Sequence, residues 1–185
     1  PVFKRLSDTT LPSPKDKFIL KADRLAKTEA IEVKIDGLAG PAKNFSLVYD
    51  LLVPTAGIKG GFASLLQLGA AGTSDAEMFL KGSAGNFQLG IDSNYDGAMT
   101  ADTWNRVVVT FAENGDGTST LAKYANGTLL DTQKLPTPRF TLSDTTGLRL
   151  FNDEDGETWG LDLAAFAVVT RTLTGAEVTR LAASA

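Results

Sequence analysis

The chain has 185 residues, a formal net charge of −4 and a pI near 4.9, and it contains neither cysteine nor histidine. Disulfides, thiolate metal sites and histidine-dependent triads are therefore excluded, so an enzyme would have to use carboxylates, lysine, tyrosine or arginine. The acidic balance predicts no nucleic-acid partner, and no apolar stretch approaches the ~18 residues of a membrane span. The length suits one all-β domain over residues 1–185.

The beginning of the chain predicts little regular structure. Residues 1–15, with prolines at positions 12 and 14, are typical of an extended lead-in rather than of a separate domain. The first four residues lack both an initiator methionine and the apolar segment of a signal peptide. We therefore expect the chain to be part of a longer protein.

Short β-prone runs follow, separated by Gly, Asn, Asp and Pro at a spacing typical of a sandwich. Residues 31–35 alternate strictly between apolar and polar, as a strand with one buried face does. Residues 106–111 form a continuous β-branched run, which favours an inner strand. Asn126-Gly127 predicts a type I′ turn within a hairpin over residues 121–130. The other predicted strands are 45–51, 87–91, 148–151 and 165–170.

The apolar positions of these runs predict the core of an antiparallel, jelly-roll-like all-β sandwich. Alternation within each run assigns ten residues to it: Phe45, Leu47, Tyr49, Phe87, Leu89, Val107, Val109, Phe111, Phe151 and Phe166.

The end of the chain predicts one short helix. Thr174-Gly175-Ala176-Glu177 is a capping box, in which the Thr174 hydroxyl accepts from the Glu177 amide and the Glu177 carboxylate accepts from the Thr174 amide. Val178 and Leu181 then form one apolar stripe, so we expect the helix to dock on the sandwich.

Three blocks, in this order and spacing, resemble the laminin-G-like branch of the concanavalin A-like lectin/glucanase superfamily. They are residues 103–110, where Trp104 opens an apolar run, the Tyr124-Ala125-Asn126-Gly127 hairpin, and residues 165–178 with their Arg-Thr-Leu-Thr segment. The resemblance spans residues 45–182 and implies a jelly-roll sandwich. It implies no single function, because this fold carries lectins, adhesion modules, hydrolases and lyases.

An acidic loop follows the predicted strand at residues 148–151. It resembles a loop of a bacterial subgroup whose modules are appended to larger secreted or cell-surface proteins, which implies an extracellular location. Its oxygen-bearing side chains could supply part of a calcium coordination shell; the candidate ligands are Asn152, Asp153, Asp155 and Glu157. The alternative is a solvated acidic turn without an ion.

Aromatic side chains in turn-rich segments are the candidate sugar platforms, because a pyranose lies flat on a ring. Trp159 follows the acidic loop and Tyr95 lies between Asn94 and Asp96, so we expect these four residues to contact a ligand. Trp104 begins an inner strand, and we expect it in the core.

These observations favour a non-catalytic module that binds carbohydrate or a cell-surface glycan. The first alternative is a structural or adhesive spacer that contacts protein, including other domains of a parent protein. The second is a polysaccharide hydrolase or lyase. Retaining hydrolases need two carboxyls about 5–5.5 Å apart in one cleft, and the sequence lacks the alternating acidic strand motif that supplies them. We therefore expect no catalytic activity.

Overall fold

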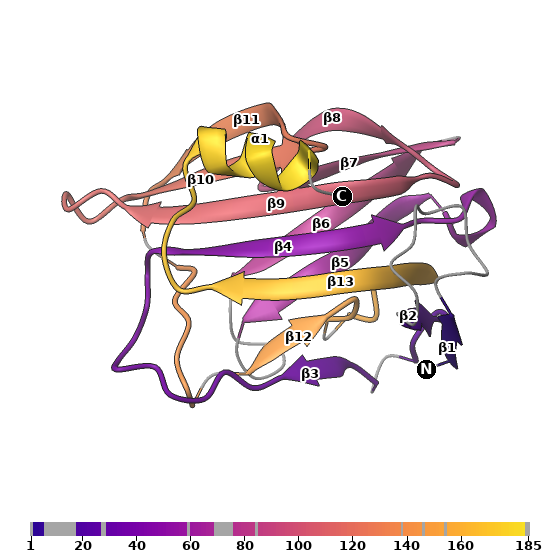
Figure 1. The fold of residues 1–185 in the computed structure, drawn as a ribbon, viewed down its shortest axis with the longest axis horizontal. Coiled ribbons are helices and arrows are strands. Elements are labelled where there is room, and N and C mark those ends of the chain that lie inside the picture. The colour runs from indigo at the N-terminus through magenta and orange to yellow at the C-terminus, as the bar shows by residue number, and fades with distance from the viewer. Residues whose placement is uncertain are drawn as a thin grey trace.

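The computed structural model describes residues 2–5, 18–26, 29–58, 60–68, 76–83, 85–137, 139–145, 147–153 and 155–183. In this part of the chain two antiparallel sheets face each other and a helix lies outside them (Figure 1). This confirms the predicted all-β sandwich with a short C-terminal helix. Most of the expected lead-in, residues 1–15, lies outside the described residues; Val2–Arg5 form the first strand.

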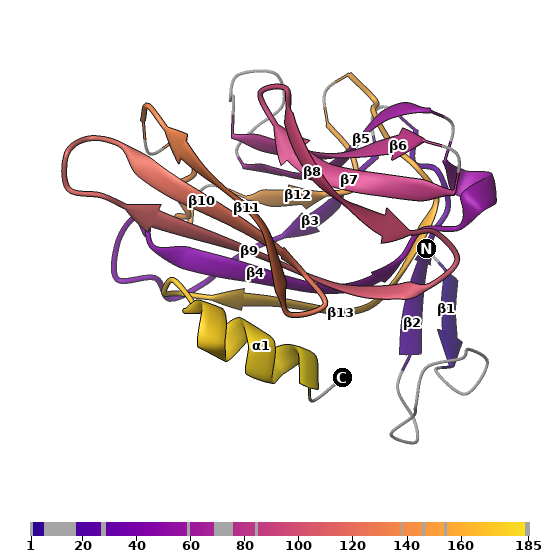
Figure 2. The same ribbon diagram turned by 90° about the horizontal axis from the view of Figure 1, so that it is seen from above.

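The seven-stranded sheet has the order β1 (Val2–Arg5), β2 (Phe18–Ala22), β13 (Leu161–Val169), β4 (Phe45–Leu52), β9 (Trp104–Glu113), β10 (Ser119–Ala125) and β11 (Thr128–Leu135). The six-stranded sheet has the order β3 (Ile31–Val33), β12 (Leu148–Leu150), β5 (Gly61–Leu68), β6 (Glu77–Ser83), β7 (Asn86–Ile91) and β8 (Asn94–Thr100). A 3-10 turn, Thr55–Gly57, follows β4. In Figure 2 the two sheets form two layers, with β4, β9 and β13 in one and β5 to β8 in the other.

All seven predicted runs form strands, but sequence patterning missed β1, β2, β5, β6 and β8. A register shift between Ser64 and Leu66 interrupts the alternation of β5, and its last six residues are buried whichever face they lie on. β8 is polar and contains Gly97, so it resembled a turn, yet it pairs with β7 along its length. The type I′ turn is confirmed, because Asn126 and Gly127 have φ values of 51° and 81°.

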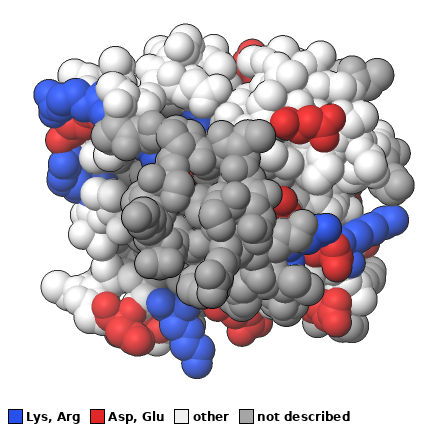
Figure 3. All heavy atoms as spheres, turned by 45° about the vertical axis from the view of Figure 1, so that its right-hand side comes forward, with Lys and Arg blue, Asp and Glu red and all other residues white. Residues whose placement is uncertain are grey.

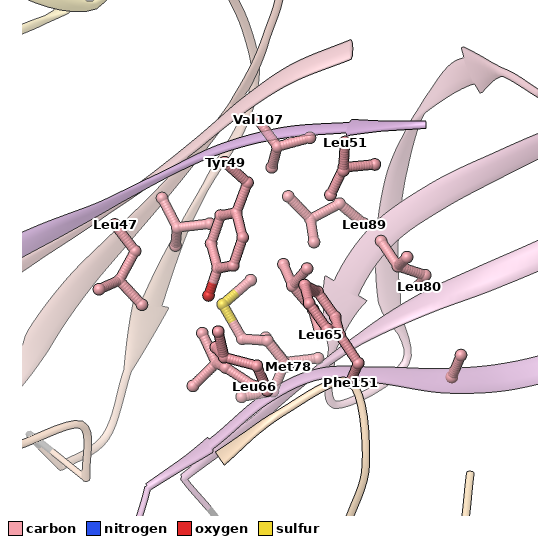
Figure 4. Packing of buried hydrophobic residues seen from close by; sticks show 14 of the residues in the cluster. Leu47, Tyr49, Leu51, Leu65, Leu66, Met78, Leu80, Leu89, Val107 and Phe151 are labelled. Carbon is pink, nitrogen blue, oxygen red and sulfur yellow. The ribbon is translucent and has the colours of Figure 1, made fainter. Parts of the chain in front are cut away.

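The core lies between the sheets and contains the predicted residues. Nine of the ten are buried; Phe166 is partly buried and packs against Tyr49, with ring centroids 5.0 Å apart. Tyr49 projects from β4 toward β6, with its hydroxyl beside the sulfur of Met78 (Figure 4). That hydroxyl has no hydrogen-bond partner among the described residues, and burial raises the pKa of Tyr49 well above its usual value.

Helix α1 (Gly175–Ala183) packs on the outer face of the seven-stranded sheet (Figure 2). The capping box is confirmed: the Thr174 amide donates to Glu177 Oε2 at 2.8 Å, and the Glu177 amide donates to Thr174 Oγ1 at 3.3 Å. Val178 and Leu181 pack against Val108 and Tyr124, as the apolar stripe predicted. No helix in the described ranges is long and apolar enough to cross a membrane.

Candidate functional site

The outer face of the six-stranded sheet carries three neighbouring aromatic side chains. Phe62 comes from β5, Phe79 from β6 and Tyr95 from β8. The centroid of the Phe62 ring lies 6.2 Å from that of Phe79 and 5.3 Å from that of Tyr95. Phe62 is 38% exposed, whereas most large apolar side chains of the described residues are buried. Together with Lys81 on β6, these rings form what we call the outer aromatic face.

Strand register explains why the rings meet. Phe79 is paired with Gly90, and Gly90 is paired with Tyr95, so these residues form one row across β6, β7 and β8. A Cβ atom on Gly90 would lie 2.7 Å from Tyr95 Cδ1. Since Gly90 has no side chain, the Tyr95 ring can lie over the strand in the direction of Phe62.

A cation lies beside this cluster. The Lys81 Nζ atom is 5.8 Å from the centroid of the Phe62 ring and 5.3 Å from that of Tyr95, within the range of cation–π attraction. Burial, followed by the negative charges of Glu157 and Asp92, raises the pKa of Tyr95 to about 12. The Tyr95 hydroxyl therefore stays protonated at neutral pH and can both donate and accept a hydrogen bond.

The face combines apolar rings, a hydroxyl and an ammonium group on a rigid sheet. Aromatic rings can take the apolar face of a sugar, while the polar groups can reach its hydroxyls. Sequence reasoning identified Tyr95 but missed Phe62, Phe79 and Lys81. The alternation in β6 carried the signal: Met78 and Leu80 point into the core, so Phe79 between them points outward.

Asn94 and Asp96 do not join Tyr95 on this face, because side chains alternate along β8. Both bind Lys123 of β10 instead. The Lys123 Nζ atom donates to Asn94 Oδ1 at 2.9 Å and to Asp96 Oδ2 at 2.8 Å. It also lies 3.4 Å from Asp131 Oδ2. The Lys123 side chain is fully buried. Because Lys123 comes from β10 and Asp96 from β8, this ionic contact joins the two sheets at the β8–β11 end.

The prediction of an exposed Trp159 is wrong. Trp159 is 2% exposed and belongs to the core between the sheets. A Cβ atom on Gly82 would lie 2.6 Å from Trp159 Cη2, so the indole fits against a strand position that lacks a side chain. With no free face, the ring cannot serve as a sugar platform, and the four predicted ligand contacts do not form one site.

Trp104 also departs from its prediction, since it is only partly buried. It lines a surface depression of about 380 Å³ together with Thr103 of the β8–β9 turn and with Thr128 and Leu130 of β11. The Asn126 side chain at its rim is already bonded to Asn105 and to the Arg106 amide. This depression shares no lining residue with the outer aromatic face.

The acidic loop is held together by hydrogen bonds from its own backbone amides to the side chain of Asp153. Asp153 is buried and its Oδ1 atom accepts from the amides of Asp155 and Glu157, each at 3.0 Å. The Asn152 side-chain amide donates to the carbonyl groups of Ala26 and Glu29. Within the described ranges no three acidic side chains gather closely enough to hold a metal ion. Calcium binding at Asn152, Asp153, Asp155 and Glu157 stays a prediction.

Charged residues are mixed over the view in Figure 3. Acidic and basic side chains lie next to each other there, and much of the described surface is uncharged. Ion pairs between described residues include Arg106 with Asp50 at 2.6 Å and Lys43 with Glu113 at 2.7 Å.

No protein-family model and no curated protein sequence matches this chain. Several solved structures are similar in fold. A heptameric SAP-like pentraxin from Limulus polyphemus has a TM-score of 0.64 at 14% identity, over 90% of this chain and 82% of that one. The binding domain of botulinum neurotoxin DC, solved with rat synaptotagmin II, has a TM-score of 0.60 at 13% identity, over 99% of this chain and 45% of that one. Trypanosoma rangeli sialidase has a TM-score of 0.55 at 17% identity, over 76% of this chain and 22% of that one.

These likenesses establish the jelly-roll sandwich fold. The chain spans most of the pentraxin, but less than half of the toxin binding domain and about a fifth of the sialidase. The fold occurs in proteins with different roles, so the function of this chain has to be argued from its own residues.

Proposed function

We propose that the chain is a non-catalytic binding module whose ligand is a carbohydrate, bound on the outer aromatic face. The observation that carries this proposal is the exposure of Phe62 beside Tyr95 and Phe79 on one rigid sheet. Rings held by a sheet lose little freedom on binding, and a pyranose covers them without a deep cavity.

The similar structures support a binding role. One is named as the binding domain of a toxin, and it was solved in complex with a protein, synaptotagmin II. We infer that this chain belongs to the concanavalin A-like superfamily and acts at the cell surface or outside the cell as part of a larger protein. A spacer that contacts protein is the second candidate, which the protein complex of the toxin domain favours.

The composition supports a non-catalytic role. Because the chain has no histidine, general acid–base work would fall to carboxylates or tyrosine. The pKa of Tyr95 is raised to about 12, which makes this phenol a poor base at neutral pH. The sialidase is similar to this chain in fold at 17% identity, a likeness that carries no argument for catalysis.

The test is calorimetric titration of a panel of neutral and acidic oligosaccharides into wild type, Phe62→Ala and Tyr95→Ala. We expect each truncation to weaken binding by about 1–2 kcal/mol, as for other aromatic contacts. Leu129→Ala is the matched control, because Leu129 is an apolar side chain, 50% exposed, on the other sheet. A reducing-end assay on the same panel checks for catalysis.

Two results would contradict the proposal. Binding that survives both ring truncations would place the ligand elsewhere, and an absence of any glycan binding would favour the spacer. Turnover that persists through purification would show an enzyme.

A further inference from the structure

Lys81 differs from six of the other cations whose contacts are described. Lys43, Lys123, Lys134, Arg106, Arg139 and Arg171 each have a carboxylate partner. Lys81 is exposed and, among the described residues, contacts aromatic rings rather than a carboxylate. Its positive charge is therefore available to a ligand that reaches the outer aromatic face.

The surroundings of Lys81 fit a carboxylate beside a sugar ring. Lys81 is paired with Phe62 on one side and with Gln88 on the other, so a ring, a cation and an amide follow one another across three strands. The Gln88 side-chain amide donates a long hydrogen bond of 3.4 Å to the Tyr95 carbonyl. The nearby Asp92 is already paired with Arg139.

From this arrangement we propose that the outer aromatic face selects acidic sugars: a carboxylated pyranose stacks on Phe62 and Tyr95 while its carboxylate pairs with Lys81. Both uronic and sialic acids carry this chemistry. The inference rests on the proposed carbohydrate-binding function and narrows it to one class of ligand. Lys81 supplies charge complementarity, and the rings supply the contact area.

The test compares pairs of ligands in which one member carries a carboxylate and the other is its neutral counterpart. Tetragalacturonate is compared with its methyl ester, and sialyllactose with lactose, by calorimetry with the whole chain. At about 20 mM salt we expect at least one acid to bind about 3- to 10-fold tighter than its neutral counterpart, and about 0.5 M salt should largely remove the difference. The pair that shows the preference identifies the uronic or the sialic source.

Variants then assign the preference to Lys81. Lys81→Gln should abolish the difference between acid and neutral ligand, and Lys81→Arg should retain it. Lys134→Gln removes the same charge from the other sheet and should have no effect. Circular dichroism and melting curves verify that each variant is folded.

The outcomes separate the inference from the proposed function. Equal binding of acid and neutral forms, or a preference unchanged in Lys81→Gln, would overturn the acidic-sugar inference and leave carbohydrate binding in place. If no oligosaccharide of either kind binds, the proposed function fails and the inference fails with it.

Discussion

Lys123 shows how strand alternation divides neighbouring residues between different tasks. Asn94 and Asp96 point toward the buried ammonium of Lys123, whereas Tyr95, between them, lies on the outer aromatic face. A buried lysine is costly unless its charge is paired and its donors are satisfied. Here two carboxylates and Asn94 meet that requirement, so the ion pair also holds β8 against β10 and β11.

Removing this ammonium should destabilise the fold. We expect Lys123→Ala to cost about 2–3 kcal/mol in urea unfolding, because it leaves Asp96 and Asp131 facing each other without a counter-charge. The cost should fall short of that for a fully buried pair, since the two carboxylate side chains are 36% and 29% exposed.

Two variants sharpen this measurement. Lys123→Met removes the charge but keeps most of the side-chain volume. The loss of unfolding free energy that both Lys123→Met and Lys123→Ala show therefore reports on the charge rather than on packing. Lys134→Ala removes an exposed lysine, 64% accessible and paired with Asp116, and should change stability by less than about 0.5 kcal/mol. Equal effects at positions 123 and 134 would show that the sheets do not depend on the buried ion pair.

At the scale of an element, α1 is anchored at both ends. Its first turn is closed by the capping box, and Glu177 also pairs with Arg171 at 2.7 Å. Near its last turn, the Leu181 carbonyl accepts from the guanidinium of Arg106, whose Nε and Nη2 atoms bind Asp50. A Cβ atom on Gly127 would lie 2.8 Å from Ala182 Cβ, so the helix packs closely over the β10–β11 turn.

The capping box gives the helix a pH-dependent contribution to stability. Hydrogen bonds from Arg171, then from the Thr174 amide and hydroxyl, lower the pKa of Glu177 from 4.5 to about 2. A carboxyl whose folded pKa is lowered stabilises the protein above its unfolded pKa, and this contribution disappears as the pH falls through the folded pKa. We therefore expect wild type to lose more stability than Glu177→Gln between about pH 4.5 and pH 2.

Thr174→Ala tests the same cap at neutral pH. It should cost about 0.5–2 kcal/mol, because the side-chain acceptor of the Glu177 amide is lost. Parallel pH profiles of wild type and Glu177→Gln, together with an unchanged unfolding midpoint in Thr174→Ala, would show that the helix is not docked in solution.

At the scale of the whole molecule, the two sheets leave opposite outer faces for different uses. Helix α1 covers part of the seven-stranded sheet, while the outer aromatic face lies on the six-stranded sheet (Figure 2). A core that includes Trp159, Tyr49 and Phe151 holds the sheets together. The proposed ligand surface is therefore a rigid one, since β5, β6 and β8 are set by the register of one sheet.

Calcium would act on this whole molecule through linkage. If Asp153, Asp155 and Glu157 hold the ion, binding to the native state alone raises its stability by mass action, so millimolar calcium should raise the melting temperature and a chelator should lower it. Asp155→Asn should reduce the rise. A melting temperature that ignores both calcium and chelator would leave the loop as a turn organised by Asp153.

Local patterns were enough to predict the class of fold, the hairpin turn and the capped helix. Asn126-Gly127 and Thr174 to Glu177 act through neighbours in sequence, so their geometry follows from residue type alone. The alternation of Phe45, Leu47 and Tyr49 likewise assigns one face to the core without any knowledge of the partner strand.

Tertiary structure decided where the candidate site lies. Phe62, Lys81 and Tyr95 come from three strands, and only the pairing of β5 to β8 makes them neighbours. Trp159 looked exposed beside an acidic loop, but the space over Gly82, distant in sequence, accommodates its ring in the core. Contact between distant residues depends on which strands pair and in which register, and this pairing is a long-range property that no local pattern of this chain encodes.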